Sequence, residues 1–310
     1  MEKVLNCLAC NSKNFNAFIK TTAMMHEQGT TKYNFDKCEN CGLVFLNSRI
    51  PESELGPFYS ENYLPYRVEE AWGKYANFVK RDQQNIDQAR VKRVKDYNNL
   101  TRESRILDVG CGKPTFLAQF YKDTPAHLIG LDFSDEGWKN NPEIFRELDL
   151  RVGEVSDLKG ESAVDAITMW HYLEHDYEPQ KHLKNLLDIA HSETKLIIEV
   201  PNFDSYTRRK FGEHWAGYHS PRHTALYSAN NIEMLLKNSG WQVEQILTFG
   251  TLNPFTIHWM SEMERKGIDW SGSMESRFIG FVAGMILYKP IYMFQKWFSM
   301  GFLTVIAKPA

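Results

Sequence analysis

Residues 105–120 have the sequence RILDVGCGKPTFLAQF, and this stretch decides the fold. An apolar run that contains Asp108 leads into Gly110 and Gly112, and a helical pattern follows. Glycines let the backbone approach a ligand closely, and the helix after them presents free amide groups at its N-terminus. The stretch therefore predicts a buried strand, a ligand-binding turn and a helix.

A second apolar run indicates what the turn binds. Residues 127–133, HLIGLDF, end close to Asp132, about twenty residues after the turn. An acidic side chain at this distance can accept hydrogen bonds from both hydroxyl groups of a ribose. The pair of strands therefore predicts a nucleotide-binding site.

The remaining apolar runs predict the rest of the sheet. Short β-branched runs at 149–154, 164–171 and 195–202 alternate with helical stretches, and each is apolar enough to be buried on both faces. After residue 240, the runs 241–250 and 301–310 predict a closing strand pair. The alternation predicts an α/β fold: a Rossmann-like, doubly wound, seven-stranded sheet with helices on both faces. Apolar residues at helical spacing predict one helix over residues 68–100, leading into this domain.

The glycine turn resembles the first motif of the class I S-adenosylmethionine-dependent methyltransferases, which is acidic-x-Gly-x-Gly-x-Gly. Asp108, Gly110 and Gly112 match it, and Pro114 stands where the third glycine is usual. The resemblance implies that Asp108 and Gly110 lie near the methionine part of S-adenosylmethionine. It also implies that Asp132 holds the ribose.

The resemblance extends further along the chain. It implies that Glu154, in RVGEVSDL, lies near the adenine, and that a cofactor-facing turn follows the fourth strand at MWHYLEH, which includes Trp170. Two other interpretations remain: an ordinary strand-end acid and turn, or a nicotinamide-binding Rossmann domain. Against the second stands the fingerprint GxGxxG, whose third glycine is missing here.

Four of the five cysteines form two CxxC pairs, which are Cys7 with Cys10 and Cys38 with Cys41. Four thiolates around one tetrahedral centre suit Zn²⁺, and a site filled by sulfur has no position for water, so the predicted zinc is structural. Structural cysteines without a metal, or another metal such as iron, are the alternatives.

The two cysteine pairs, with CGLVF and YSENY after them, also resemble the N-terminal part of sugar C-methyltransferases. Those enzymes carry a further C-terminal domain that we expect this shorter chain to lack.

Two histidine-rich stretches follow predicted strand ends, MWHYLEH and residues 208–228. The second has the composition of a substrate lid. Methyl transfer to a hydroxyl or a carbon acid requires that a proton be removed, and histidine, with a pKa near 6.5, is the natural base. We predict His171, then His223, then His219 as the general base, with Tyr218 and Glu174 as orienting groups. A structural role is the alternative for each of them.

Composition limits the partners. With 36 basic and 39 acidic residues the formal net charge is −3, so nucleic acid is not an expected partner. The first residues lack the pattern of a secretory signal, which predicts a cytoplasmic protein.

An apolar insert at about residues 251–300 has three interpretations. It could form helices packed on the protein's own core, contact a membrane surface or lipid-like acceptor, or make a homodimer contact.

These patterns divide the chain into a zinc-ribbon module (1–50), a helical connector and cap (51–100) and a methyltransferase domain (101–310). The predicted function is S-adenosylmethionine-dependent methylation, at oxygen or carbon, of a small-molecule acceptor, which includes a sugar or a lipid-like one. The alternative is a cofactor-binding, non-catalytic regulatory or assembly protein, which Pro114 favours. A zinc-ribbon methyltransferase acting on nucleic acid is a third hypothesis, opposed by the net charge and by the absence of an Asn-Pro-Pro-Tyr motif.

Overall fold

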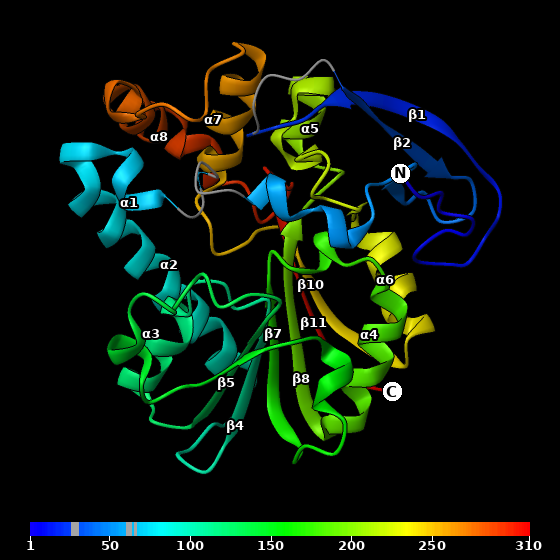
Figure 1. The fold of residues 1–310 in the computed structure, drawn as a ribbon, viewed down its shortest axis with the longest axis vertical. Coiled ribbons are helices and arrows are strands. Elements are labelled where there is room, and N and C mark those ends of the chain that lie inside the picture. Colours follow the sequence, from blue (N-terminus) through cyan, green and yellow to red (C-terminus); the bar gives the residue numbers. More distant parts are fainter. Residues whose placement is uncertain (26–30, 60–63, 65–66) are drawn as a thin grey trace.

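The computed structural model describes residues 1–25, 31–59, 64 and 67–310. Figure 1 shows a twisted sheet with helices on both sides and, above the carboxyl ends of its central strands, a cap of helices and a small second sheet. Most of the YSENY segment lies outside the described residues. The cap and the strand ends below it enclose the region where the predicted site lies.

All seven predicted strands are present, and they form one sheet in the order β10-β11-β8-β7-β4-β5-β6. The strands are β4 (Arg105–Val109), β5 (His127–Asp132), β6 (Asp149–Val152), β7 (Val164–Trp170), β8 (Ala190–Pro201), β10 (Trp241–Leu247) and β11 (Phe302–Pro309). Strands β4 to β8 run parallel, and β11 runs antiparallel between β8 and β10. The predicted α/β fold is confirmed.

Helices cover both faces of this sheet, which explains why its central strands are apolar without interruption. On one face lie α2 (Ala76–Tyr97) and α3 (Thr115–Asp123), and on the other lie α4 (Pro179–Asn185) and α6 (Ala229–Asn238). Successive side chains of a strand point to opposite faces. Accordingly, Ile106 packs in the cluster with α2 and α3, whereas Leu107 packs in the cluster with α4 and α6.

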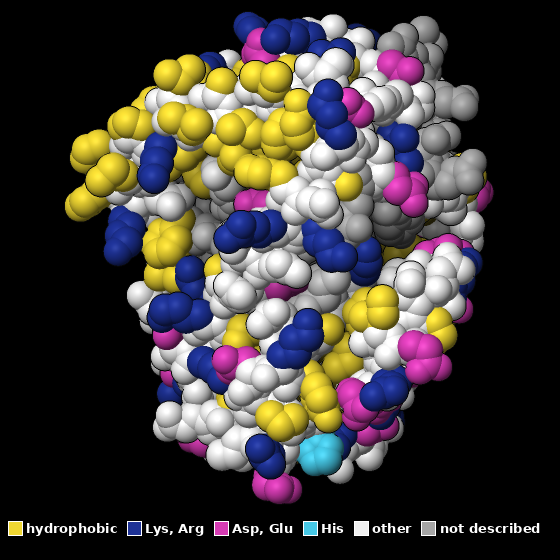
Figure 2. Space-filling model, turned by 90° about the vertical axis from the view of Figure 1, so that its left-hand side faces the viewer, with side chains coloured by type: hydrophobic (Ala, Val, Ile, Leu, Met, Phe, Trp, Pro, Cys, Tyr) yellow, Lys and Arg dark blue, Asp and Glu magenta, His cyan; other side chains and the backbone are white. Residues whose placement is uncertain are grey.

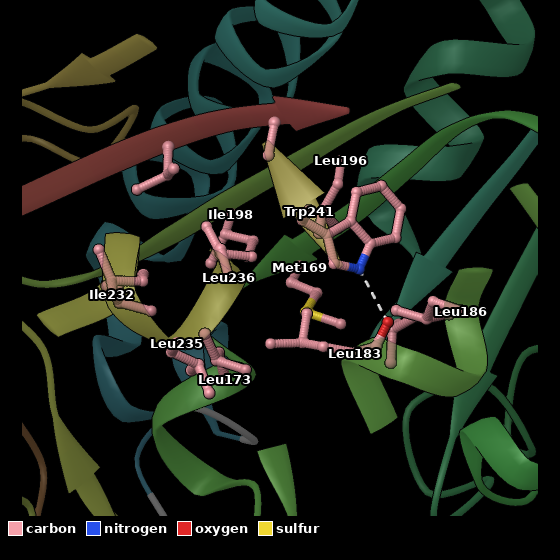
Figure 3. Close-up of a cluster of buried hydrophobic side chains, with 14 of the residues drawn as sticks. Met169, Leu173, Leu183, Leu186, Leu196, Ile198, Ile232, Leu235, Leu236 and Trp241 are labelled. Carbon is pink, nitrogen blue, oxygen red and sulfur yellow. Dashed lines mark hydrogen bonds between the residues drawn. The ribbon is translucent and has the colours of Figure 1, made fainter. Parts of the chain in front are cut away.

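The cluster under α4 and α6 fixes the closing strand pair onto the sheet (Figure 3). Trp241, at the start of β10, is 1% exposed, and its indole N–H donates to the carbonyl of Leu183 at 2.8 Å. Met169 and Ile198 from the sheet and Leu235 from α6 surround it. Each such buried side chain contributes about 1.5 to 3 kcal/mol through the apolar surface it removes from water.

The predicted N-terminal module is not separate from the rest of the chain. Its three strands, β1 (Phe15–Thr22), β2 (Lys32–Cys38) and β3 (Val44–Leu46), form an antiparallel sheet that is completed by β9 (Ala225–Leu226). Strand β9 lies within the histidine-rich stretch 208–228, two residues after His223. The cysteine region and the predicted lid therefore share a sheet.

The cap contains α1 (Val68–Ala71), α5 (Tyr206–Phe211), α7 (Pro254–Arg265) and α8 (Phe278–Tyr292) around a third hydrophobic cluster. The predicted single helix over 68–100 was wrong at its start, because Gly73, with φ +50°, begins a 3₁₀ turn that separates α1 from α2. The insert supplies α7 and α8, and its inner side packs on the cap core. Among the described residues, no helix has both the length and the apolar character needed to cross a membrane.

Candidate cofactor and acceptor site

The turn after β4 requires glycine. Gly110 and Gly112 have φ of +73° and +48°, in the region that side chains rarely adopt. A Cβ atom on Gly110 would also lie 2.4 Å from the ring of Tyr172. The first glycine is therefore needed both for its backbone conformation and for close packing.

Asp132, at the end of β5, is held by the same turn. Its Oδ2 accepts a hydrogen bond from the Gly112 N–H at 2.8 Å, and its Oδ1 accepts one from the Ser134 N–H at 3.3 Å. Burial raises the pKa of this carboxyl, and the backbone donors partly offset the effect. A carboxylate oxygen accepts more than one hydrogen bond, so Asp132 keeps acceptor capacity for a ligand.

Asp108 is nearly enclosed, with 3% of its surface exposed, and its Oδ1 accepts a hydrogen bond from the Thr168 hydroxyl at 2.6 Å. Burial raises the pKa of Asp108 to about 7, against the lowering effects of Thr168 and of the Arg90 charge. Arg90 comes from α2, and its guanidinium lies 5.1 Å from the ring centre of Trp170. Arg90 was not among the predicted site residues, because its only signal in the sequence was its spacing of three residues from Asp87 on a helix.

Trp170 and Glu154, the other two predicted cofactor residues, differ in accessibility. Trp170 ends β7 with its side chain buried against Phe116, at 5.5 Å between ring centres, and its indole N–H has no hydrogen-bond partner. Glu154 follows β6, is exposed, and caps the 3₁₀ turn after it, where its N–H donates to Asp157. Their roles toward a cofactor stay predictions.

His171 follows β7 in a left-handed conformation, φ +58°, which turns its ring toward two buried carboxylates. Its Nε2 lies 3.2 Å from Glu199 Oε1, and its Nδ1 lies 3.4 Å from Glu174 Oε1. Burial disfavours the charged ring, but the hydrogen bonds and charges of Glu174 and Glu199 outweigh this and raise the pKa of His171 to about 9. The side chain of His171 is 20% exposed, so it is not fully enclosed.

Glu199 is a site residue that sequence analysis missed. It lies on β8, is fully buried, and accepts hydrogen bonds from the N–H and the hydroxyl of Thr251 at 2.6 and 3.0 Å. Burial raises its pKa, but His171 outweighs this effect, so the net shift is downward. Its sequence signal was a single acid within the apolar run 195–202.

Three further histidines lie together beside Glu174. The ring of His223 is 4.6 Å from that of His175 and 4.9 Å from that of His219. His223 and His219 are almost completely buried. Burial, followed by the charge of His175, lowers the pKa of His223 to about 3, and burial with the charge of Arg222 also lowers the pKa of His219. These two histidines are thus neutral at pH 7, whereas His171 is mostly protonated.

The tautomer of His223 follows from its contact with the backbone. Its Nδ1 lies 2.8 Å from the carbonyl oxygen of Gly217, and a carbonyl can only accept, so Nδ1 carries the proton. The Nε2 of the neutral ring is then an acceptor. Of the predicted orienting groups, Glu174 lies in this cluster, whereas the ring of Tyr218 packs against Phe35 and Trp215 in the cap core.

The segment that ends at Tyr59 connects the two sides of the site. The hydroxyl of Tyr59 lies 3.0 Å from His175 Nδ1, and its ring lies 5.6 Å from that of Phe133. Phe133 follows Asp132 directly and is 62% exposed. The side chain of Tyr59 therefore contacts both the residue that follows β5 and the histidine cluster.

The four N-terminal cysteines have the geometry of a metal site. The sulfur atoms of Cys7 and Cys41 are 3.5 Å apart, those of Cys10 and Cys38 are 3.6 Å apart, and all four lie within 4.8 Å of one another. Four sulfurs about 2.3 Å from a central Zn²⁺ would have nearly these separations. The donor set therefore fits a structural zinc.

Glu174, His175 and His223 also bring one ligand atom each within 4.8 Å. Because Glu174 pairs with His171, and each of these two histidines has a ring nitrogen in a hydrogen bond, we interpret this group as an acid–base cluster.

Comparison with solved structures gives chains of the same fold. One comes from the complex between the Haloferax volcanii Trm112 methyltransferase activator and a putative methyltransferase, with TM-score 0.51, 16% identity, and coverage of 79% of this chain and 97% of that chain. Another is the mycolic acid cyclopropane synthase CmaA1 complexed with SAH and CTAB, with TM-score 0.50, 12% identity, and coverage of 72% of this chain and 83% of that chain. At these identities the likeness shows the fold alone.

No curated protein matches the chain. The family model described as "Methyltransferase domain" matches residues 78–246, which is more than half of the chain. These residues contain the glycine turn, Asp132 and the complete histidine cluster. The chain belongs to the methyltransferase-domain family and has the class I S-adenosylmethionine-dependent methyltransferase fold.

Proposed function

We propose that this protein transfers the methyl group of S-adenosylmethionine to an oxygen or carbon atom of a small-molecule acceptor, including a sugar or a lipid-like molecule. One observation carries the proposal: Asp132 and the glycine turn lie beside a buried cluster of histidines and carboxylates, at the carboxyl ends of adjacent parallel strands. Ligands of parallel α/β sheets bind at this edge.

On the cofactor side, Asp132 would accept hydrogen bonds from the ribose hydroxyls, and the backbone of Gly110 would hold the methionine part. Asp108, at the bottom of the turn, contributes negative charge when ionised, and Arg90 and Thr168 favour its ionised form. Glu154 and Trp170 complete the pocket. S-adenosylmethionine supplies the electrophilic methyl carbon.

On the acceptor side, His171 is the leading candidate for the base. It is more exposed than His219 or His223, and its raised pKa makes its neutral form the strongest base of the three. Glu174 and Glu199 stabilise the imidazolium that forms when His171 takes the acceptor's proton. Turnover should therefore depend on pH, because the His171 ring must lose its own proton before it can accept one from the acceptor.

His223 and His219 are the second and third candidates. Both are neutral at pH 7, and the Nε2 of His223 is an acceptor. If either of them is the base, the rate is independent of pH above neutrality. The three candidates are therefore separated by a pH profile.

A second function has one specific observation in its favour. Pro114, the N-cap of α3, stands in place of a glycine and has no N–H, so the turn offers one amide fewer to a cofactor. A weakened cofactor turn suits a protein that binds S-adenosylmethionine for regulation or assembly without catalysis.

The N-terminal cysteines hold, in this proposal, a zinc ion whose role is structural. The ion would fix the cysteine region against the small sheet that β9 completes, and so hold the histidine-rich segment in place.

The test is transfer of a labelled methyl group from S-adenosylmethionine to a panel of hydroxyl and carbon-acid acceptors, sugars and lipids among them, with cofactor affinity measured alongside. Labelled product that depends on His171 supports the methyltransferase. Cofactor binding without transfer to any class of acceptor would favour the non-catalytic alternative. Without binding of either S-adenosylmethionine or S-adenosylhomocysteine, both functions are excluded.

A further inference from the structure

Exposed apolar side chains are concentrated on one segment of the cap. Of the fourteen large hydrophobic residues that are exposed among the described residues, eight lie between residues 279 and 298. We call them the apolar patch: Ile279, Ile286, Leu287, Ile291, Met293, Phe294, Trp297 and Phe298. Figure 2 shows hydrophobic side chains gathered over this end of the molecule. Such a concentration marks an interaction surface.

The inner side of the same segment is firmly attached. Phe278, at the start of α8, stacks on Tyr75 with ring centres 3.8 Å apart, and Phe281 lies 5.4 Å from Trp259 of α7. Tyr288 packs on Phe255 at 5.5 Å. Helix α8 is therefore held by its inner side, and the apolar patch faces away from the protein core.

The charged residues within the segment that carries the apolar patch are of one sign. Between Phe278 and Met300 the sequence contains Lys289 and Lys296 and no Asp or Glu, although the chain as a whole has a net charge of −3. Both lysines are exposed. The nearby acid Glu275 is neutralised by Lys74 at 3.1 Å. Figure 2 shows Lys and Arg side chains among and beside the apolar ones.

We infer that the apolar patch docks on the surface of an anionic lipid bilayer. Apolar and aromatic side chains enter the boundary between headgroups and acyl chains, and lysines beside them contact anionic headgroups. Trp297, which is 75% exposed, has the amphipathic ring that is enriched at this boundary.

A second copy of the chain fits this surface less well. In a symmetric dimer the same surface meets itself, so Lys289 and Lys296 would face the lysines of the other copy. An anionic bilayer instead offers each lysine an opposite charge. The inference goes beyond the proposed function, since docking does not depend on catalysis.

The test uses the full chain and flotation with vesicles of phosphatidylcholine alone or mixed with phosphatidylglycerol. We expect the protein to float with the mixed vesicles and to be released by salt, because exposed charges are screened. The double change Leu287→Ser with Trp297→Ser should weaken binding at least about tenfold, since it removes two large apolar contacts. The double change Lys289→Glu with Lys296→Glu should weaken binding by about twenty-fivefold or more, at about fivefold for each lysine.

Two matched controls separate the apolar patch from general surface effects. Ile144→Ser removes an exposed apolar side chain, and Lys159→Glu reverses an exposed charge, both outside the apolar patch. We expect both to bind vesicles as the unchanged protein does. Binding of S-adenosylhomocysteine, measured on each variant, shows that it is folded.

Three results would overturn the inference. The first is absence of binding to mixed vesicles, and the second is equal binding by the patch variants and the unchanged protein. The third is a dimer in sedimentation equilibrium that Leu287→Ser with Trp297→Ser dissociates while no vesicle binding is seen, because the occupant would then be a second copy.

Discussion

On the cofactor side of the site, the predicted side chains between Asp108 and Glu154 come from one continuous unit, β4-turn-α3-β5-β6. The acceptor side is assembled differently. Its groups come from Tyr59, from the turn after β7, from Glu199 on β8, and from the segment that ends in His223. The first side follows from local sequence, whereas the second exists only once distant segments have packed together.

This difference has a functional consequence. A continuous unit can bind a cofactor with little help from the cap, whereas the charges of the histidine cluster depend on burial and on partners from several elements. Changes on one side should alter affinity, and changes on the other should alter turnover. The following predictions test that separation, beginning with the largest expected effect.

Replacing His171 with Ala should reduce turnover by about a hundredfold to ten-thousandfold if His171 is the base, because proton removal matters only in the transition state. Cofactor affinity should change little. Steady-state kinetics and calorimetry measure the two quantities. His191→Ala is the matched control, since His191 is a half-buried histidine of the same sheet that pairs with a different carboxylate, Asp165. If His171, His219 and His223 each tolerate Ala with less than about a threefold loss in the catalytic step, the acid–base role fails.

The pH profile of turnover should distinguish the histidines from one another. Since the base acts in its neutral form and the pKa of His171 is raised to about 9, turnover should rise with pH by about tenfold per unit and level off above that value. The midpoint of the pH profile, which would be near 6.5 for an ordinary histidine, is therefore expected at a higher pH. A profile already level at pH 7 would transfer the role to His223 or His219, or indicate an acceptor that needs no base.

Replacing Asp132 with Ala should weaken cofactor binding by about 1.5 to 3 kcal/mol, the range for loss of charge-assisted hydrogen bonds. Calorimetric titration with S-adenosylhomocysteine measures it. Asp135→Ala, three residues along the same loop, serves as the control. Affinity unchanged in Asp132→Ala would show that the ribose lies elsewhere.

Replacing Cys38 with Ser should release the metal and destabilise the N-terminal region. Cofactor affinity should stay within about twofold, because the unit from β4 to β6 contains none of the four cysteines. Metal analysis, thermal unfolding and cofactor titration measure the three effects. Cys111→Ser is the comparison for metal content, since Cys111 lies within the glycine turn and outside the cluster of four cysteines. A native protein with far less than one zinc per chain would contradict the zinc assignment.

The sequence predicted the sheet because every strand is a distinct apolar run, and it predicted Asp108 and Asp132 because each stands at a strand end. It did not predict Arg90, Glu199 or the contact of Tyr59 with His175, because these depend on which elements meet in space. The raised pKa of His171 depends on Glu174 and on Glu199, and Glu199 is 28 residues away in the chain. Sequence periodicity also did not predict the break at Gly73 or which side of α8 faces outward. Periodicity indicates that a segment is helical, but it does not indicate which elements pack against that helix.

The central claim is that the continuous unit around Asp132 binds S-adenosylmethionine, and calorimetric titration of the full chain with S-adenosylhomocysteine tests it most directly. We expect saturable binding with one ligand per chain, weakened in Asp132→Ala and unchanged in His171→Ala. Absence of binding, or equal binding by the unchanged protein and Asp132→Ala, would contradict the claim.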